Sequence, residues 1–217
     1  MAVDFKNRVR ATARTAPSAE DNLLLARSLI DGDSEAAQLA WRRFHPMVET
    51  TLRRMLGPGG DLQDLTQEVF LRFFGKVREL KKMESLRAFV MAIAIRRAQE
   101  EIKRRRVRRW FAPVVGEVYR GPASTQMEPE TRETIVHFYR AIDRLNAVDR
   151  SIYVLRFVEG LELTEIAATL AVSISTVRRR LERVSRRMNS LISGDPVLAE
   201  YVDARRSMRA EREQRGG

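Results

Sequence analysis

The sequence contains no cysteine, so we exclude a disulfide framework and any metal site built from thiolates. No apolar run approaches the roughly 20 residues that a membrane-spanning helix requires. The first residues, MAVDFKNRVRATARTAPSAED, also lack the apolar stretch of a secretory signal. We therefore expect a cytoplasmic protein without membrane insertion.

Glycine and proline are scarce as well, with 11 and 7 among 217 residues, and valine, isoleucine and threonine do not cluster in alternating runs. Leucine, alanine, arginine and glutamate dominate instead, and this composition favours helix over sheet. The sequence therefore predicts an all-α fold.

Basic residues outnumber acidic ones by 40 to 29, which gives a formal net charge of +11, and most of them are arginine. The planar guanidinium group matches phosphates and base edges, so this bias is typical of a nucleic-acid partner. It is equally typical of a protein from an arginine-rich genome. The positions of the arginines must decide between the two.

Helical periodicity and its interruptions divide the chain into two small helical domains. Four apolar-periodic segments with short connections precede residue 110. The second of them contains Pro46, which should bend or interrupt it, and a polar loop of residues 78–84 separates the last two. Residues 111–130 hold several glycines and prolines without helical period, which predicts a flexible linker. The predicted order is a disordered basic tail (1–18), a four-helix domain (19–110), the linker (111–130), a helix-turn-helix domain (131–193) and a charged extension with an exposed helix (194–217).

The helix-turn-helix lies in LTEIAATLAVSISTVRRRL, residues 163–181. Thr164 can cap a short first helix, and the second helix begins at Ser173 or Ser175. Ala171 stands where many such turns have glycine, which indicates a less demanding turn or a small strain. The outward side of the second helix suits the major groove of DNA through Ser175, Thr176, Arg178, Arg179, Arg180 and Arg183. The alternative is an ordinary helical hairpin with a solvated basic face.

In the first domain, the segment DLQDLTQEVFLR (61–72) combines inward apolar residues with a polar stripe. The stripe consists of Asp61, Asp64, Gln67 and Glu68, near a helix N-terminus where the helix dipole favours carboxylates. Acid–base catalysis and metal binding are disfavoured, because no paired histidine and no second carboxylate cluster accompanies them. We interpret the stripe as a docking surface for a basic partner; a solvated face is the alternative.

Residues 96–109, RRAQEEIKRRRVRR, end the fourth predicted helix with eight basic side chains among ten charged ones. Such a density of like charge repels itself along a helix, and a polyanion would relieve the repulsion. We favour nucleic acid as the partner. The alternative is a solvated, fraying helix end.

Together these segments resemble bacterial sigma factors of the extracytoplasmic-function class. DLQDLTQEVFLRFF is similar to the family signature D-x-x-D-L-x-Q-E-x-F, and LTEIAATLAVSISTVRRRLERVSRRM is similar to the family's promoter-reading motif. The resemblance covers residues 20–110 and 131–192, in the family's order and spacing. It implies a transcription initiation factor that binds core RNA polymerase and directs it to promoters. It also implies no cofactor, no metal and no enzymatic activity.

The resemblance assigns roles to individual residues. The stripe of Asp61, Asp64, Gln67 and Glu68 matches the polymerase-binding stretch, and the outward residues of the helix-turn-helix match −35 recognition. The part that captures unpaired bases of the −10 element is matched by Leu80, Lys81, Lys82, Met83, Arg96, Arg97, Lys103 and Arg104. One residue departs from the family: Arg96 stands where an Arg-Asn pair often has its asparagine, which puts the usual −10 specificity or melting in doubt.

Two other functions stay open at this point. A stand-alone helix-turn-helix regulator would keep the DNA-binding motif but need no acidic stripe, and a degenerate sigma would bind polymerase without initiating transcription. An enzyme is the weakest interpretation, because His45 and His137 are isolated and no glycine-rich phosphate loop is present. An anti-sigma factor is a further partner that the resemblance allows.

Overall fold

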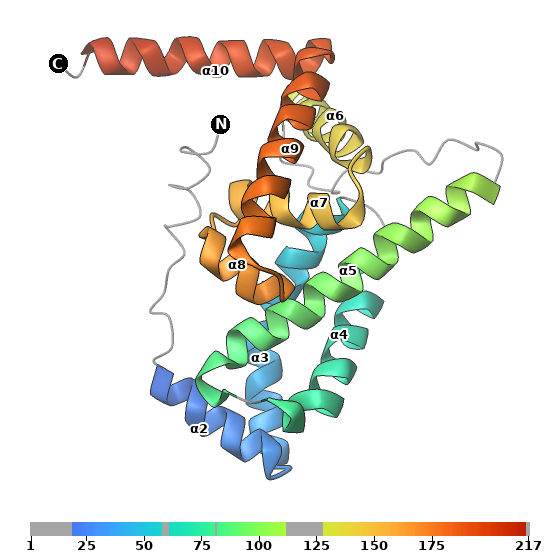
Figure 1. Cartoon of the computed structure of the whole chain (residues 1–217), viewed down its shortest axis with the longest axis vertical. Helices are drawn as coiled ribbons and strands as arrows, with labels where there is room; N and C mark the ends of the chain where they lie inside the picture. Colours follow the sequence, from blue (N-terminus) through green and yellow to red (C-terminus); the bar gives the residue numbers. More distant parts are fainter. Residues whose placement is uncertain (1–18, 58–60, 81, 112–127, 216–217) are drawn as a thin grey trace.

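The computed structural model describes residues 19–57, 61–80, 82–111 and 128–215 (Figure 1). Every regular element within these ranges is helical, which confirms the predicted all-α fold. The predicted tail, Lys81 and most of the predicted linker lie outside the described residues.

Four helices form the first domain. They are α2 (Ala19–Ile30), α3 (Ser34–Leu56), α4 (Leu62–Lys76) and α5 (Leu86–Phe111), and two short 3-10 turns, Val77–Glu79 and Met83–Ser85, occupy the predicted polar loop. The expected interruption at Pro46 is not present, because α3 runs through this residue without a break. Phe44 and Val48 are buried on either side of it, and their packing offsets the roughly 3 kcal/mol that a helix-interior proline costs.

The core of this domain lies between α3, α4 and α5. Its largest buried side chains include Phe44, Leu52, Phe70, Phe73 and Leu86. Burying each side chain of this size stabilises the fold by about 1.5–3 kcal/mol. Packing therefore fixes α4 against α5, and the polar faces of these two helices are held in a defined relation to each other.

The second domain contains α6 (Pro129–Asp143), α7 (Ala147–Tyr153), α8 (Leu163–Leu170), α9 (Ile174–Ser193) and α10 (Pro196–Arg215). α7 continues into a wider helical turn, Val154–Val158, where the Glu159 amide donates to the Val154 carbonyl at 2.9 Å. α8 and α9 form the predicted helix-turn-helix. α10 crosses the end of α9 and extends away from the other helices (Figure 1). A 2.7 Å contact between His137 and Asp195 joins α6 to the turn before α10.

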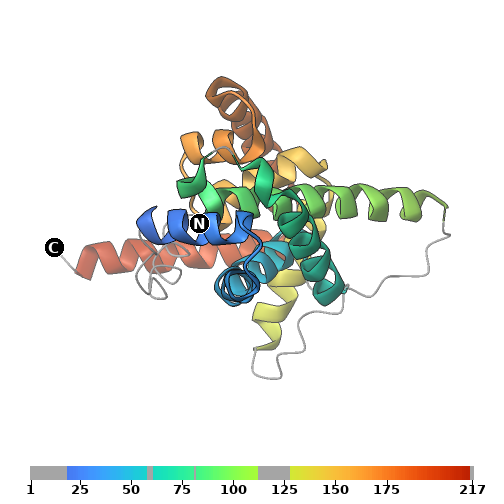
Figure 2. The same ribbon diagram turned by 90° about the horizontal axis from the view of Figure 1, so that it is seen from below.

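The two domains pack against each other along α5, the long helix in the middle of the molecule (Figure 2). Met91 and Ile95 of α5 are buried in one cluster with residues of the second domain, Ile152, Leu155, Ile166, Ala167 and Val177. Polar contacts accompany this cluster: the Gln99 amide donates to the Ser151 hydroxyl at 2.9 Å, and Arg54 pairs with Glu159 at 2.7 Å. This interface was not predicted from the sequence.

Candidate nucleic-acid interface

The turn between α8 and α9 sets the start of the second helix of the helix-turn-helix. Ala171 has φ 54° and ψ 47°, which is a left-handed conformation. Of the two expectations for this position, a less demanding turn or a small strain, the structure therefore supports the small strain. The Ser173 hydroxyl accepts a hydrogen bond from the Thr176 amide at 3.2 Å, so α9 begins at the first of the two predicted positions. Thr164 is not the cap of α8. The helix begins after Glu162, whose amide donates to the Glu165 side chain at 2.7 Å.

α9 has one buried side and one polar side. Val177, Val184 and Met188 are buried. On the polar side of its first turns, Arg178 and Arg179 are exposed, and so is Ser175. Thr176 is half-buried, and its hydroxyl lies 2.8 Å from that of Ser173. Hydroxyl and guanidinium groups at a helix N-terminus are the arrangement with which a recognition helix enters the major groove.

Arg180 and Arg183 lie further along α9, and both contact Asp149 of α7. Arg183 Nη2 is 2.9 Å from each carboxylate oxygen, and Arg180 Nη1 is 3.2 Å from Oδ1. Asp149 is buried and also accepts a hydrogen bond from Asn146 Nδ2 at 2.7 Å. These two arginines, predicted as DNA contacts, therefore also fasten α9 to α7.

The structure does not place Arg97 at the surface, where the predicted −10 contact requires it. Its side chain is 8% exposed, and two of its guanidinium nitrogens donate to the two carboxylate oxygens of Glu68 on α4. The reason is position: residue 97 of α5 faces α4, and a buried guanidinium without a partner would be strongly destabilising. Arg97 and Glu68, predicted on two separate binding surfaces, thus form one ion pair. Arg96 and Lys103 are exposed, and their predicted −10 contacts stay predictions.

Arginines depress the pKa of two carboxylates in this region. The hydrogen bond from Arg97 lowers the pKa of Glu68 and outweighs burial, which raises it. Burial raises the pKa of Glu101, but hydrogen bonds from Arg104 and Arg105 outweigh it, so the pKa of Glu101 is also lowered. Both carboxylates therefore stay ionised at neutral pH.

The predicted −10 loop is partly integrated into the first domain. Leu80 and Met83 are half-buried and pack against its core. Lys82 is exposed, and Lys81 lies outside the described residues. Arg104, in the second half of α5, is exposed. The predicted role of this loop in base capture stays a prediction.

The polar stripe of α4 is mostly accessible. Asp61 caps the helix by accepting from the Asp64 amide at 3.2 Å, and Asp64 and Gln67 are exposed. Glu68 is half-buried and engaged with Arg97. Leu71, 72% exposed, extends the stripe by one helical turn.

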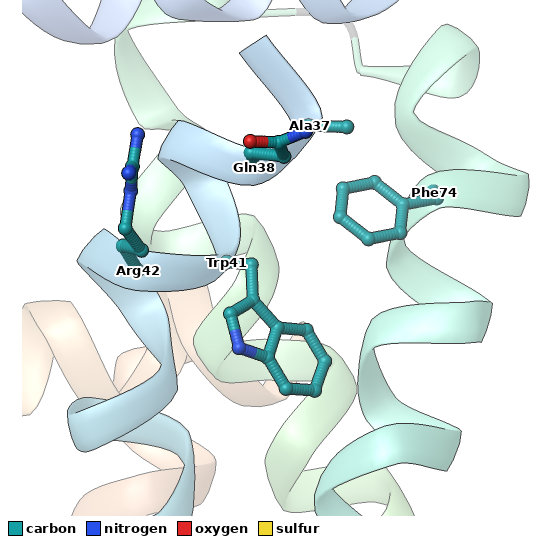
Figure 3. Close-up of a pocket in the computed structure, with 5 residues that line it drawn as sticks. All are labelled: Ala37, Gln38, Trp41, Arg42 and Phe74. Carbon is teal, nitrogen blue, oxygen red and sulfur yellow. The ribbon is translucent and has the colours of Figure 1, made fainter. Parts of the chain in front are cut away.

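Sequence reasoning missed an open pocket beside this stripe, between α3 and α4. It encloses about 360 Å³ and is lined by Ala37, Gln38, Trp41, Arg42 and Phe74. The Phe74 ring and the Trp41 indole project toward the space between the two helices (Figure 3). The sequence does indicate an apolar residue next to the stripe, because Phe74 follows Gln67 by seven residues and therefore lies on the same helix face.

Both histidines make structural contacts. His45 lies against Trp41 and Phe70, and His137 pairs with Asp195. Within the part of the chain that the structure describes, no three His, Asp or Glu side chains are grouped as a metal site requires. None of the described helices is long and apolar enough to cross a membrane.

The geometry defines a two-domain helical protein with a helix-turn-helix, and two family models match it, one over each domain. Sigma-70 region 2 matches residues 40–108, and Sigma-70, region 4 matches residues 135–188. Together the two models cover more than half of the chain. The chain therefore belongs to the sigma-70 family, whose members are non-enzymatic, promoter-recognising transcription initiation factors.

Known proteins place the chain in the extracytoplasmic-function class. It is 29% identical over 136 residues to the ferric citrate uptake sigma factor FecI of Escherichia coli (strain K12), across 62% of this chain and 78% of that protein. It is 33% identical over 162 residues to the ECF RNA polymerase sigma factor SigE of Mycolicibacterium smegmatis, across 69% of this chain and 60% of that protein. A structure of the sigma factor RpoE with the anti-sigma factor NepR from Bartonella quintana shares the fold, with a TM-score of 0.55 and 18% identity over 73% of this chain and 97% of that one.

Proposed function

We propose that this chain binds core RNA polymerase through α4 and directs it to promoters. In this proposal the first turns of α9 read −35 duplex DNA, while α5 and the preceding loop open and hold the −10 element. No hydrolysis is involved, because capture of flipped bases offsets the stacking that is lost on melting. We expect this activity in the cytoplasm, where polymerase and chromosome meet.

The observation that carries the proposal is the first part of α9. Ser175, Arg178 and Arg179 are exposed together next to the Ser173 cap, where the helix N-terminus adds partial positive charge. In such a position a guanidinium group reaches the edge of guanine, and a hydroxyl reaches a phosphate. A solvated hairpin would need none of this clustering.

The α4 surface supports polymerase as the partner rather than DNA. Asp64 and Gln67 are exposed, and an acidic surface repels phosphates while it attracts a basic protein surface. Leu71 and the pocket beside Trp41 and Phe74 add apolar area to the same side. A polar stripe with an apolar anchor point is typical of a protein–protein interface.

The packed arrangement of the domains has to change on the promoter. The names −10 and −35 place these elements about 25 base pairs apart, or about 85 Å at about 3.4 Å per base pair. Here Val177 of α9 lies in the same buried cluster as Met91 and Ile95 of α5, so the two DNA-binding helices share one packed core. α9 itself spans only about 30 Å. We therefore propose that the domains separate when the factor engages polymerase and DNA.

A protein of the anti-sigma class is a further partner that we propose. The support is the structure of RpoE with NepR, whose fold this chain shares. An anti-sigma factor that favours the packed arrangement would keep the two DNA-binding helices on one shared core.

Transcription in vitro with purified core polymerase tests the proposal. We expect specific initiation only when both the chain and a matching promoter are present. Asp64→Ala and Gln67→Ala should each weaken retention on immobilised core polymerase by about 1–2 kcal/mol, or roughly 5- to 30-fold. Lys76→Ala is the control, because Lys76 is exposed on another side of the same helix, nine residues after Gln67.

The outcomes separate the alternatives. Tight promoter binding without polymerase would identify a stand-alone regulator and contradict the proposal. Polymerase binding without initiation would identify a degenerate sigma, for which the exposed Arg96 would be the first residue to examine.

A further inference from the structure

A buried carboxylate organises the arginines in the second half of α5. The Glu101 side chain is only 3% exposed, although it is charged. Its Oε2 atom lies 2.8 Å from Arg104 Nε and 3.5 Å from Arg97 Nη1. Its Oε1 atom lies 3.0 Å from Arg105 Nε and 3.5 Å from Arg108 Nη2. A single acid therefore faces four guanidinium groups.

Two of these arginines reach the surface. The side chains of Arg104 and Arg108 are 60% and 61% exposed. They follow Glu101 by three and seven residues, so both project along the same side of the helix. Glu101 holds Arg104 through its Nε, and the two Nη groups of Arg104 remain available for another oxyanion.

The cluster is also tied to the rest of the domain. Arg97 bridges Glu101 on α5 to Glu68 on α4, and Arg105 Nη1 donates to the Leu56 carbonyl of α3 at 3.4 Å. A free arginine loses side-chain entropy when it is immobilised on a ligand. Arginines that are already held in place lose less when they bind, so the same contact gives a higher affinity.

We propose that Glu101 is a positioning residue for nucleic-acid binding: it orients Arg104 and Arg108 so that their guanidinium groups contact backbone phosphates of promoter DNA. This inference rests on the proposed function. Glu101 is negatively charged and by itself repels DNA. Its removal should therefore strengthen DNA binding if charge alone matters, and weaken it if Glu101 orients the arginines.

The test compares Glu101→Gln with Glu100→Gln in holoenzyme bound to promoter DNA. Both variants remove one negative charge from α5, and bulk electrostatics predicts that both bind DNA as tightly as the wild type or more tightly. Glu100 is the matched control, because its side chain is 52% exposed and pairs with Arg72 outside the cluster. We expect Glu100→Gln to follow the electrostatic prediction. We expect Glu101→Gln to bind about 5- to 20-fold more weakly despite its added positive charge.

The salt dependence supplies a readout that a purely structural role would not change. If Glu101→Gln loses two oriented phosphate contacts, the slope of log K against log salt should become shallower by about one to two. A second variant, Arg104→Lys, keeps the charge but cannot reproduce the Nε contact with Glu101. We expect it to weaken binding by about 3- to 10-fold with an unchanged melting temperature, because Arg104 is mostly exposed.

Glu101→Gln that binds as tightly as Glu100→Gln, with the wild-type salt slope, would overturn the inference. If Glu101→Gln does not fold, Arg104→Lys decides, and wild-type affinity of that variant would likewise overturn it. The wild-type holoenzyme separates failure of the proposed function from failure of the proposed role of Glu101. If it does not assemble or does not bind promoters, the proposed function fails, whereas equal behaviour of the two glutamate variants removes only the role of Glu101.

Discussion

α5 and α9 are both arginine-rich helices, yet the structure uses their arginines in different ways. On α5, Arg97 is turned inward to Glu68, and Arg104 is held by Glu101. On α9, Asp149 holds Arg180 and Arg183, while Arg178 and Arg179 stay exposed beside the helix N-terminus. The number of arginines is therefore a poor guide to which of them reach DNA. Neighbouring carboxylates instead decide which arginines are turned inward, as Arg97 is, and which are held at the surface, as Arg104 is.

The two helices also differ in burial. α5 is covered by its own domain on one side and by the helix-turn-helix domain on another, whereas α9 lies with its polar side at the periphery. Separation of the domains would therefore change the surroundings of α5 more than those of the outer side of α9. We therefore expect that preventing separation of the domains has a larger effect on function than changing single side chains.

The largest effect is expected from a covalent link between the domains. Because the chain has no cysteine, Arg54→Cys with Glu159→Cys provides the only two thiols for a short, reductant-cleavable bismaleimide. These positions face each other across the interface, where the native side chains pair at 2.7 Å. We expect the linked protein to lose promoter-dependent transcription by about 100-fold, because one of the two DNA contacts is forfeited. Cleavage of the linker should restore it.

Each single-cysteine variant, treated with the same reagent, controls for modification of the thiol. Full activity of the linked protein would show that the domains do not need to separate. The greater burial of α5 compared with α9 would then have no effect on promoter binding.

The next effect concerns the exposed arginines of α9. Arg178→Ala and Arg179→Ala should each cost about 1–3 kcal/mol of promoter affinity, measured on DNA with an intact −35 element. The loss should shrink when the −35 sequence is randomised, because a base contact specifies sequence and a phosphate contact does not. Arg186→Ala, exposed nearer the other end of α9, is the matched control. Equal losses on both DNAs would instead assign these arginines to phosphate.

A smaller effect is expected in acid, and it concerns the carboxylates of α5 and α4. The folded-state pKa values of Glu68 and Glu101 are lowered from 4.5. The stability that each contributes is therefore complete above pH 4.5 and is lost as the pH falls through the lower, folded pKa. We expect Tm to decrease below that pH in the wild type, and to decrease less steeply in Glu68→Gln. Glu182→Gln, which removes an exposed carboxylate from α9, should keep the wild-type slope.

Local patterns predicted most of the secondary structure, and long-range packing explains what they missed. Helical periodicity predicted α4 and the helix-turn-helix, since these depend on neighbours within a few residues. The pair between Arg97 and Glu68 joins residues 29 positions apart, so it required the packing of α4 on α5. The sequence also indicates the interface around Met91 and Ile95. The segment LRAFVMAIAI, residues 86–95, is apolar on nearly every side, which is typical of a helix that is buried on two faces.

The smallest effect concerns the turn that starts α9. Ala171 is the only non-glycine residue with positive φ within the described residues, and a left-handed conformation costs a residue with a Cβ about 1–2 kcal/mol. Ala171→Gly removes that strain, but the added conformational entropy of glycine lowers the free energy of the unfolded chain by about 0.4–1 kcal/mol. We therefore expect a net stabilisation of about 0.5–1 kcal/mol, seen as a rise in Tm of about 1–4 °C.

Ala168→Gly is the matched control for this turn, because Ala168 is exposed in the interior of α8 with right-handed geometry. There glycine should destabilise by about 1 kcal/mol. Opposite signs at two alanines three residues apart would show that the turn, rather than helix propensity, sets the outcome. A lower Tm for Ala171→Gly would mean that the strain at Ala171 is smaller than the entropic stabilisation that glycine gives to the unfolded chain.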